Sequence, residues 1–180
     1  MSPFSIPNLS LVVLVGPSGS GKSTFAARHF RRTEVLSSDF CRGLVSDDEG
    51  NQAASRDAFD VLHYIAAKRL SAGRLTVIDA TNLRTDARRP LRALALEHQF
   101  ILVAIVFDLP EEVCLARDRA RPDRNVGKDV LGAQRLLLER TLRNLPRQGF
   151  DLTYILRTPE EADAATIERV PFWCELTERP

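Results

Sequence analysis

A glycine-rich segment near the amino terminus has the composition and order of a phosphate-binding loop. Residues 16–24 read GPSGSGKST and directly follow an apolar run, Leu11 to Val15. They fit the pattern G-x-x-x-x-G-K-[ST], in which bare backbone N–H groups wrap a phosphate chain and the positive end of the next helix points at it. The residues predicted to surround the phosphates are Gly16, Ser18, Gly19, Ser20, Gly21, Lys22, Ser23 and Thr24. The segment therefore predicts a binding site for the triphosphate of a nucleotide such as ATP.

Two side chains of this loop and one distant aspartate suit the donor phosphates and a Mg²⁺ ion. Lys22 adds a mobile charge for the β- and γ-phosphates, and the Ser23 hydroxyl is placed to ligate Mg²⁺. Asp79 ends the apolar run Leu75–Ile78 and suits a carboxylate on the metal side, although it could instead cap the next turn. Ala80 follows it, where water-activating ATPases usually carry an acid. This difference favours transfer to a bound acceptor over hydrolysis.

A second polar group, SSDFCR, lies just past the predicted strand Glu34–Ser37. Loops at the carboxyl ends of parallel strands bind ligands in such sheets, so Asp39 is expected to face the same cleft as Lys22. A kinase acting on a hydroxyl needs a carboxylate that orients the hydroxyl and accepts its proton. Arg42 could fix Asp39 or hold an acceptor phosphate. A helix cap beside a surface arginine is the alternative.

A third group consists of arginines that lead into a segment with helix-breaking residues. Arg117 and Arg121 are one helical turn apart and share a face, and Arg124 lies just beyond. The run Arg121–Gly127 contains Pro, Asn and Gly, which predicts a lid over the phosphate site. Arginines in this position suit a clamp on the γ-phosphoryl group. A solvated basic face is the alternative.

Short apolar runs alternate with helical patterns along the whole chain. Strands are predicted at Leu11–Val15, Glu34–Ser37, Leu75–Ile78, Ile101–Phe107 and Leu152–Leu156. Helices are predicted at Lys22–Phe30, Ser55–Leu70, Thr85–Gln99, Glu111–Arg121, Lys128–Leu145 and Pro159–Glu168. The alternation predicts an α/β fold with a parallel five-stranded sheet, helices on both of its faces and a helical lid. Residues 1–170 are expected to form one domain, and the aperiodic residues 171–180 a linker.

Composition and charge narrow the class of protein further. The chain has 180 residues, a formal net charge of +1 and 44% apolar residues. The small net charge argues against a protein whose whole surface is basic and binds nucleic acid. No apolar run approaches the ~18–20 residues that cross a bilayer. Cys41, Cys114 and Cys174 are odd in number and widely spaced, so neither a disulfide framework nor a zinc site is indicated. A reducing, cytoplasmic location without membrane contact is expected.

Several stretches together resemble the 5′-kinase domain of bacterial polynucleotide kinase-phosphatases over about residues 5–170. They are LSLVVLVGPSGSGKSTFA, EVLSSDFCRGLVSDDE, AFDVLHYIAAKRL, LTVIDATN and the run 117–124. The resemblance implies a P-loop kinase that moves the γ-phosphoryl group of ATP or another nucleoside triphosphate, with Mg²⁺, to the 5′-hydroxyl end of RNA or DNA in end-healing repair. It also implies that phosphatase and adenylyltransferase domains follow in the full-length protein.

The resemblance assigns roles to particular positions. Lys22 and Ser23 match the residues that serve the donor phosphates and Mg²⁺, and Asp39 matches the general base. Arg42 matches a residue on the acceptor side, and Arg117 and Arg121 match the lid arginines on the donor phosphates. Two other functions stay open on the residues alone. They are a small-metabolite kinase on the same fold and a nucleotide-switched binding module without transfer activity.

Overall fold

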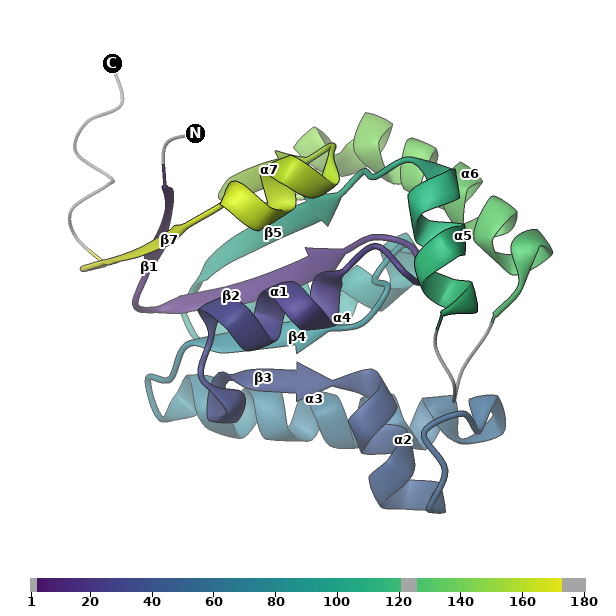
Figure 1. Cartoon of the computed structure of the whole chain (residues 1–180). Coiled ribbons are helices and arrows are strands. Elements are labelled where there is room, and N and C mark those ends of the chain that lie inside the picture. The colour runs from purple at the N-terminus through teal and green to yellow at the C-terminus, as the bar shows by residue number, and fades with distance from the viewer. Residues whose placement is uncertain (1–2, 121–125, 173–180) are drawn as a thin grey trace.

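The computed structural model describes residues 3–120 and 126–172. Five parallel strands form its central sheet in the order β3-β4-β2-β5-β6 (Figure 1). Their bounds are β2 (Ser10–Val15), β3 (Val35–Ser37), β4 (Thr76–Asp79), β5 (Ile101–Phe107) and β6 (Leu152–Leu156). These are the five strands predicted from the sequence, with ends that differ by one residue at most. The predicted parallel five-stranded sheet is confirmed.

Helices cover both faces of this sheet, as predicted. Their bounds are α1 (Lys22–His29), α2 (Ser38–Ser46), α3 (Ser55–Ser71), α4 (Thr85–Glu97), α5 (Glu111–Arg119), α6 (Lys128–Asn144) and α7 (Pro159–Ala164). Short 3₁₀ turns, η1 (Arg32–Glu34), η2 (Gln52–Ala54) and η3 (Leu145–Arg147), complete the connections. The α3, α4 and α6 helices pack on one face, and α1 and α7 on the other.

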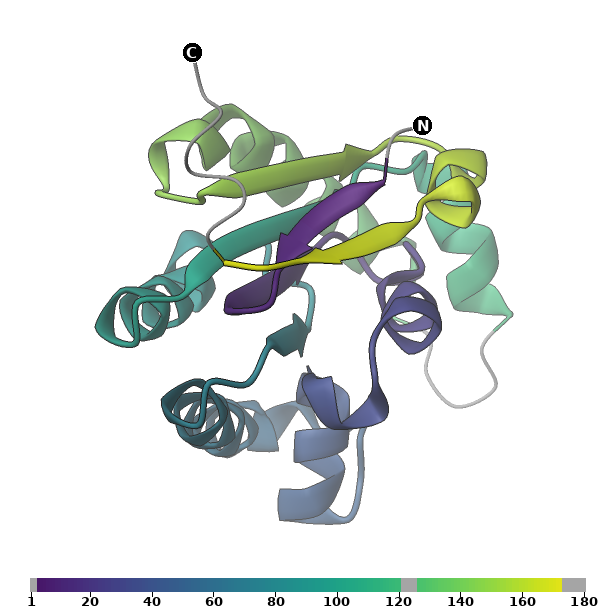
Figure 2. The same cartoon turned by 90° about the vertical axis from the view of Figure 1, so that its left-hand side faces the viewer.

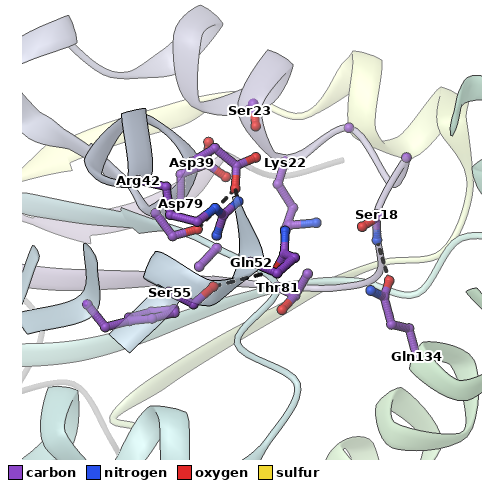
Figure 3. Close-up of a pocket in the computed structure, with 15 residues that line it drawn as sticks. Ser18, Lys22, Ser23, Asp39, Arg42, Gln52, Ser55, Asp79, Thr81 and Gln134 are labelled. Atoms are coloured by element: carbon purple, nitrogen blue, oxygen red, sulfur yellow. Dashed lines mark hydrogen bonds and ion pairs between the residues drawn. The ribbon is translucent and has the colours of Figure 1, made fainter. Parts of the chain in front are cut away.

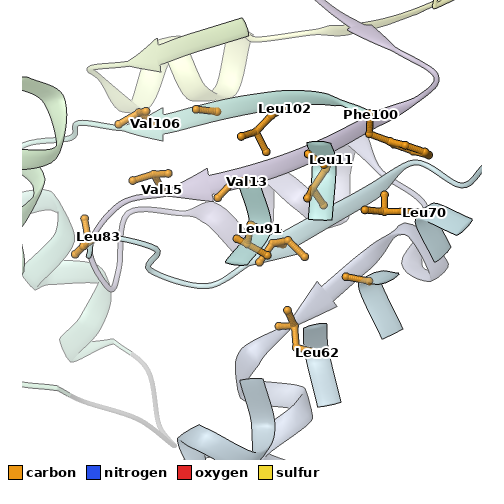
Figure 4. Packing of buried hydrophobic residues seen from close by; sticks show 14 of the residues in the cluster. Leu11, Val13, Val15, Leu62, Leu70, Leu83, Leu91, Phe100, Leu102 and Val106 are labelled. Atoms are coloured by element: carbon orange, nitrogen blue, oxygen red, sulfur yellow. The ribbon is translucent and has the colours of Figure 1, made fainter. Parts of the chain in front are cut away.

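The central strand β2 shows why its sequence is continuously apolar. Its side chains alternate between the two faces, because successive residues of a strand point to opposite sides. Leu11, Val13 and Val15 pack with α3 and α4 (Figure 4), whereas Val12 and Leu14 pack with α1. Every residue of β2 is buried. Burial on both faces holds the end of this strand, and the loop that follows it, in a fixed position.

The prediction of a loop directly after β3 was wrong, because residues 38–46 form the helix α2. The Ser37 hydroxyl accepts a hydrogen bond from the Phe40 N–H at 3.3 Å, which satisfies one of the donors that a helix start leaves unpaired. The helix has nine residues and includes Gly43. A segment this short gives too few apolar repeats to be recognised by periodicity.

A second, two-stranded sheet joins the two ends of the described chain and was not predicted. Its strands, β1 (Phe4–Pro7) and β7 (Ile167–Val170), pair in parallel (Figure 2). The predicted helix Pro159–Glu168 therefore ends earlier, at Ala164. The pairing joins segments about 160 residues apart, so no local pattern reveals it. Within residues 3–120 and 126–172, no helix is long and apolar enough to cross a membrane.

Candidate active site

A cavity of about 180 Å³ opens at the carboxyl ends of the central strands (Figure 3). The predicted site residues that line it come from the phosphate-binding loop, α1, α2 and β4. They are Ser18, Gly19, Gly21, Lys22, Ser23, Asp39, Arg42 and Asp79. The parallel topology explains the convergence, since the loops after β2, β3 and β4 all leave the same edge of the sheet.

The phosphate-binding loop has a conformation that requires glycine at two positions. Gly21 has φ +92 and Gly19 has φ +74, in the left-handed region that L side chains avoid. A Cβ atom on Gly19 would also overlap the carbonyl oxygen of Cys114, because the backbone of α5 packs directly on the loop. A Cβ atom on Gly21 would lie 3.2 Å from Nη1 of Arg117. The loop is thus covered closely by α5.

The close approach of α5 predicts that Gly19→Ala destabilises the protein more than an ordinary glycine substitution. Gly73 is the matched control, because it has φ +66 but no atom within 4 Å of an added Cβ. Gly73→Ala should cost about 1–2 kcal/mol from backbone strain alone. Gly19→Ala should cost at least about 1 kcal/mol more, measured by urea unfolding at equilibrium. Equal costs would contradict the packing of α5 on the loop.

Lys22 lies inside the loop rather than projecting from it. Its Nζ donates hydrogen bonds to the Pro17 carbonyl oxygen at 2.7 Å and to the Ser20 hydroxyl at 3.3 Å. The residue is buried but lines the cavity. A buried ammonium group is tolerated only where polar partners replace water. The loop therefore positions a positive charge at the wall of the cavity.

Asp39 and Arg42 form an ion pair across one turn of α2. Nη2 of Arg42 donates to Oδ1 of Asp39, and its Nε donates to the Glu49 carbonyl oxygen at 2.8 Å. The Arg42 side chain is only 4% exposed, so the alternative of a surface arginine is wrong. The Asp39 side chain keeps 33% exposure on the cavity wall. The buried arginine thus holds an accessible carboxylate in a fixed orientation.

Asp79 lies at the end of β4, buried on the same cavity wall as Ser23. It is the register partner of Ser37, the last residue of the neighbouring strand β3, and Asp39 follows two residues after Ser37. Among the described residues, no cluster of three or more His, Cys, Asp or Glu side chains could hold a metal ion. A hydroxyl and a single carboxylate are nevertheless oxygen donors of the kind that Mg²⁺ prefers when substrate phosphates supply other ligands.

The predicted lid arginines are placed only in part. Arg117, on α5, lines a second cavity of about 280 Å³ together with Gly19, Gly21, Arg28 and Asp163. Arg121 and Arg124 lie outside the described residues, as does most of the predicted lid segment.

The segment that follows is attached to α5 by Asp118, a residue that was not singled out in the sequence. The buried Oδ2 of Asp118 accepts hydrogen bonds from the Val126 N–H at 3.1 Å and the Gly127 N–H at 3.3 Å.

Two further features of the site were also missed. Gln134, on α6, accepts a hydrogen bond from the Ser18 N–H at 2.7 Å (Figure 3). Gln52, Ser55 and Phe59, which come from η2 and α3, line the same cavity. No signal in the sequence separates the polar residues Gln134, Gln52 and Ser55 from ordinary surface ones, because the fold brings them to the site from distant segments.

A buried arginine network connects the loop after β4 to the phosphate-binding loop. Arg88 donates to the Asn82 carbonyl oxygen and, through Nε, to Gln148 at 2.8 Å, and burial lowers the pKa of Arg88 to about 10. The Asn82 side-chain amide donates to the Leu14 carbonyl oxygen at 2.8 Å. The Gly16 N–H donates to the Thr81 carbonyl oxygen at 3.0 Å. These bonds fix the position of the phosphate-binding loop relative to Asp79 at the end of β4.

Similarity to known proteins supports the fold and the phosphate-binding loop described above. A protein family described as AAA domain matches residues 11–145, and the chain belongs to this family. Its fold is that of several solved kinases, and the glycine-rich loop beside the cavity is the arrangement of a P-loop nucleotide-binding domain.

Three known proteins show how far the similarity extends. A chain of the Pnkp1/Rnl/Hen1 RNA repair complex is 25% identical, with a TM-score of 0.65 over 80% of this chain and 47% of that chain. Shikimate kinase from Acinetobacter baumannii is 17% identical, with a TM-score of 0.54 over 86% of this chain and 88% of that one. "Transcription factor bHLH140" of Arabidopsis thaliana is 31% identical over 111 residues, which are 62% of this chain but 11% of the relative's length.

Proposed function

We propose that this protein transfers the γ-phosphoryl group of ATP or another nucleoside triphosphate to the 5′-hydroxyl end of a polynucleotide. One observation carries the proposal. A carboxylate, Asp39, is held by the buried Arg42 on the wall of the cavity that Lys22 also lines. A hydroxyl acceptor needs such a carboxylate close to the donor phosphates. The motifs around these residues, and the similarity to a chain of an RNA repair complex, support the polynucleotide as acceptor.

The donor would lie along the phosphate-binding loop. Its base would occupy the second cavity, beside Arg117 and Arg28, and its phosphates would follow the loop amides to Lys22. Lys22 would neutralise charge on the β- and γ-phosphates. Arg121 and Arg124 are proposed to act with Arg117 on the same phosphates, on the basis of the sequence alone.

A Mg²⁺ ion would be held by Ser23, with Asp79 on the same side. When bound, Mg²⁺ neutralises the charge that develops between the β- and γ-phosphates. Both residues line the cavity and both offer oxygen, so the donor set fits this ion.

In the transfer step, Asp39 would orient the 5′-hydroxyl group for attack in line with the bond that breaks. The 5′-hydroxyl oxygen forms a bond to the γ-phosphorus, while the bond from that phosphorus to the β,γ-bridging oxygen breaks and ADP leaves. The hydroxyl proton passes to the Asp39 carboxylate and then to solvent. Because the transition state is loose, positioning and charge neutralisation should contribute more than proton removal. Arg42 has a positioning role toward Asp39, and its second proposed role is a contact with the first acceptor phosphate.

A small-metabolite kinase is the second candidate, since shikimate kinase shares the fold and the cavity is only about 180 Å³. A labelling experiment separates the two. The protein is incubated with γ-labelled ATP, Mg²⁺ and matched oligonucleotides that carry either a 5′-hydroxyl or a 5′-phosphate, as RNA and as DNA. We expect label only on the 5′-hydroxyl strands. Label on shikimate or another small hydroxyl compound, with none on the oligonucleotides, would select the second candidate.

The context of the domain is proposed from the sequence in the same way. The chain spans 47% of the similar RNA repair chain and 11% of the curated relative. We infer that residues 1–170 form the kinase unit and that residues 171–180 lead to phosphatase and adenylyltransferase domains. A cytoplasmic location agrees with the free cysteines Cys41 and Cys114, both of them buried.

A further inference from the structure

Gln134 reaches the phosphate-binding loop from a helix on the other side of the site. It lies on α6 and is partly buried, 116 positions along the chain from Ser18. Its Oε1 accepts the Ser18 N–H at 2.7 Å. It is therefore a side-chain partner of the loop itself, and it lines the same cavity as Lys22 and Asp39 (Figure 3).

The hydrogen bond determines which end of the Gln134 amide faces the cavity. The Ser18 N–H is a donor, so the atom beside it must be the carbonyl oxygen. The amide nitrogen Nε2 then lies on the other side of the group, and Figure 3 draws it toward Lys22 and Thr81. An amide nitrogen donates only. The side chain thus presents a hydrogen-bond donor to a cavity whose expected occupant is an anion.

The helix that carries Gln134 is attached firmly to the site. The next residue, Arg135, donates to Oδ1 of Asp108 at 2.8 Å and to the Leu109 carbonyl oxygen at 3.2 Å, just past β5. One turn further on, Leu138 is completely buried. Thr141 donates to the Leu83 carbonyl oxygen at 2.7 Å. A donor on such a helix is preorganised, so little entropy is lost when a ligand accepts its hydrogen bond.

The two cavities on either side of the loop indicate which phosphate Gln134 would meet. The cavity assigned to the base of the donor nucleotide is lined by Arg117 and Arg28 and does not include Gln134. The other cavity includes Gln134 and Asp39, the residue that must face the transferred group. Gln134 is therefore on the acceptor side of the phosphate chain, where the γ-phosphoryl group lies.

We propose that Gln134 binds the γ-phosphoryl group of the donor nucleotide through Nε2 while its Oε1 holds the Ser18 N–H, and so distinguishes a triphosphate from a diphosphate. The inference rests on the donor half of the proposed function and is independent of the acceptor. It makes a helix outside the phosphate-binding loop a part of the donor site.

The substitution Gln134→Glu tests this directly. A carboxylate oxygen still accepts the Ser18 N–H, but the donor facing the cavity is replaced by a negatively charged oxygen. Affinities for ATP and ADP are measured by calorimetry with Mg²⁺ and without an acceptor. We expect ATP affinity to fall about ten- to a hundredfold, the usual size of a lost charge-assisted hydrogen bond. The loss of ADP affinity should be at least about tenfold smaller.

Two further variants complete the test. Gln99→Glu is the matched control, because it makes the same chemical change at an exposed position on the opposite edge of the sheet, next to the start of β5. It should leave both affinities unchanged. Gln134→Met removes both hydrogen bonds at similar volume and should also weaken ATP more than ADP. Equal losses for ATP and ADP, or none, in folded Gln134→Glu protein would overturn the proposal. Failure of oligonucleotide labelling would not affect it.

Discussion

Asp39→Ala is expected to lower the turnover number of phosphoryl transfer by about two to four orders of magnitude while leaving the affinity for ATP nearly unchanged. The carboxylate would act only on the attacking hydroxyl, so its loss affects the transition state and not the bound donor. Turnover is measured with a 5′-hydroxyl oligonucleotide at saturating ATP, and ATP affinity is measured separately by calorimetry.

The ion pair with Arg42 requires a second variant, because removing Asp39 leaves a buried guanidinium without its carboxylate. Such a loss destabilises proteins by about 3–5 kcal/mol when the pair is fully buried, and by less here because Asp39 is one-third exposed. Asp39→Asn keeps an oxygen that can accept from Arg42, but it cannot accept the proton. Its turnover should fall about as far as that of Asp39→Ala, with stability closer to the unsubstituted protein. Asp86→Asn, at an exposed ion pair with Arg84, is the control for loss of an aspartate. Normal turnover in folded Asp39→Asn would remove Asp39 from the mechanism.

The sequence predicted the central sheet because its strands are governed by local rules. The central strands β2 and β5 are buried on both faces, so each appears as an almost unbroken apolar run, and the helices between the strands show the spacing of an amphipathic face. The loop between β2 and α1 was predictable for the same reason. Its chemistry is contained in nine consecutive residues, 16–24.

The elements that were missed have no recognisable apolar pattern of their own. The strands β1 and β7 pair across almost the whole chain, and neither has a pattern that requires a partner. The helix α2 is short, and its first turn is stabilised by a cap from Ser37 rather than by apolar periodicity. The position of Asp39 was nevertheless expected correctly, because the first turn of α2 starts at the same edge of the sheet as the predicted loop.

The candidate site was predicted where residue type limits the chemistry, and missed where it does not. Lys22, Asp39 and Asp79 stand beside strand ends, so the topology brings them together on one cavity wall. Arg42 had three interpretations, a partner of Asp39, a contact with an acceptor phosphate and a surface arginine, and its burial excludes the last of them. Gln134 and the Arg88 network carried no such signal, because polar residues within helices usually face solvent.

Lys22→Met should weaken ATP binding and phosphoryl transfer together, unlike the Asp39 variants. The ammonium group is bonded to the Pro17 carbonyl oxygen and the Ser20 hydroxyl, so the loop itself loses an internal bridge as well as the charge that faces the phosphates. We expect a rate loss of at least about a hundredfold, since charge neutralisation is the main contribution to catalysis in phosphoryl transfer. ATP affinity should fall in the same variant, as measured by calorimetry.

A positive charge at position 22 is not expected to be sufficient for this function. A second variant therefore separates the effect of the charge from the effect of its exact position. In Lys22→Arg the charge is kept, but a planar, branched guanidinium replaces the compact ammonium group in the buried place beside Pro17 and Ser20, so binding and rate should stay low. Lys68→Met is the control, because Lys68 is an exposed cation on α3 that lies 5.3 Å from the ring centre of Tyr64. It should behave like the unsubstituted protein. Full activity in Lys22→Arg would mean that the loop supplies only a positive field, and normal ATP binding in Lys22→Met would contradict the donor site itself.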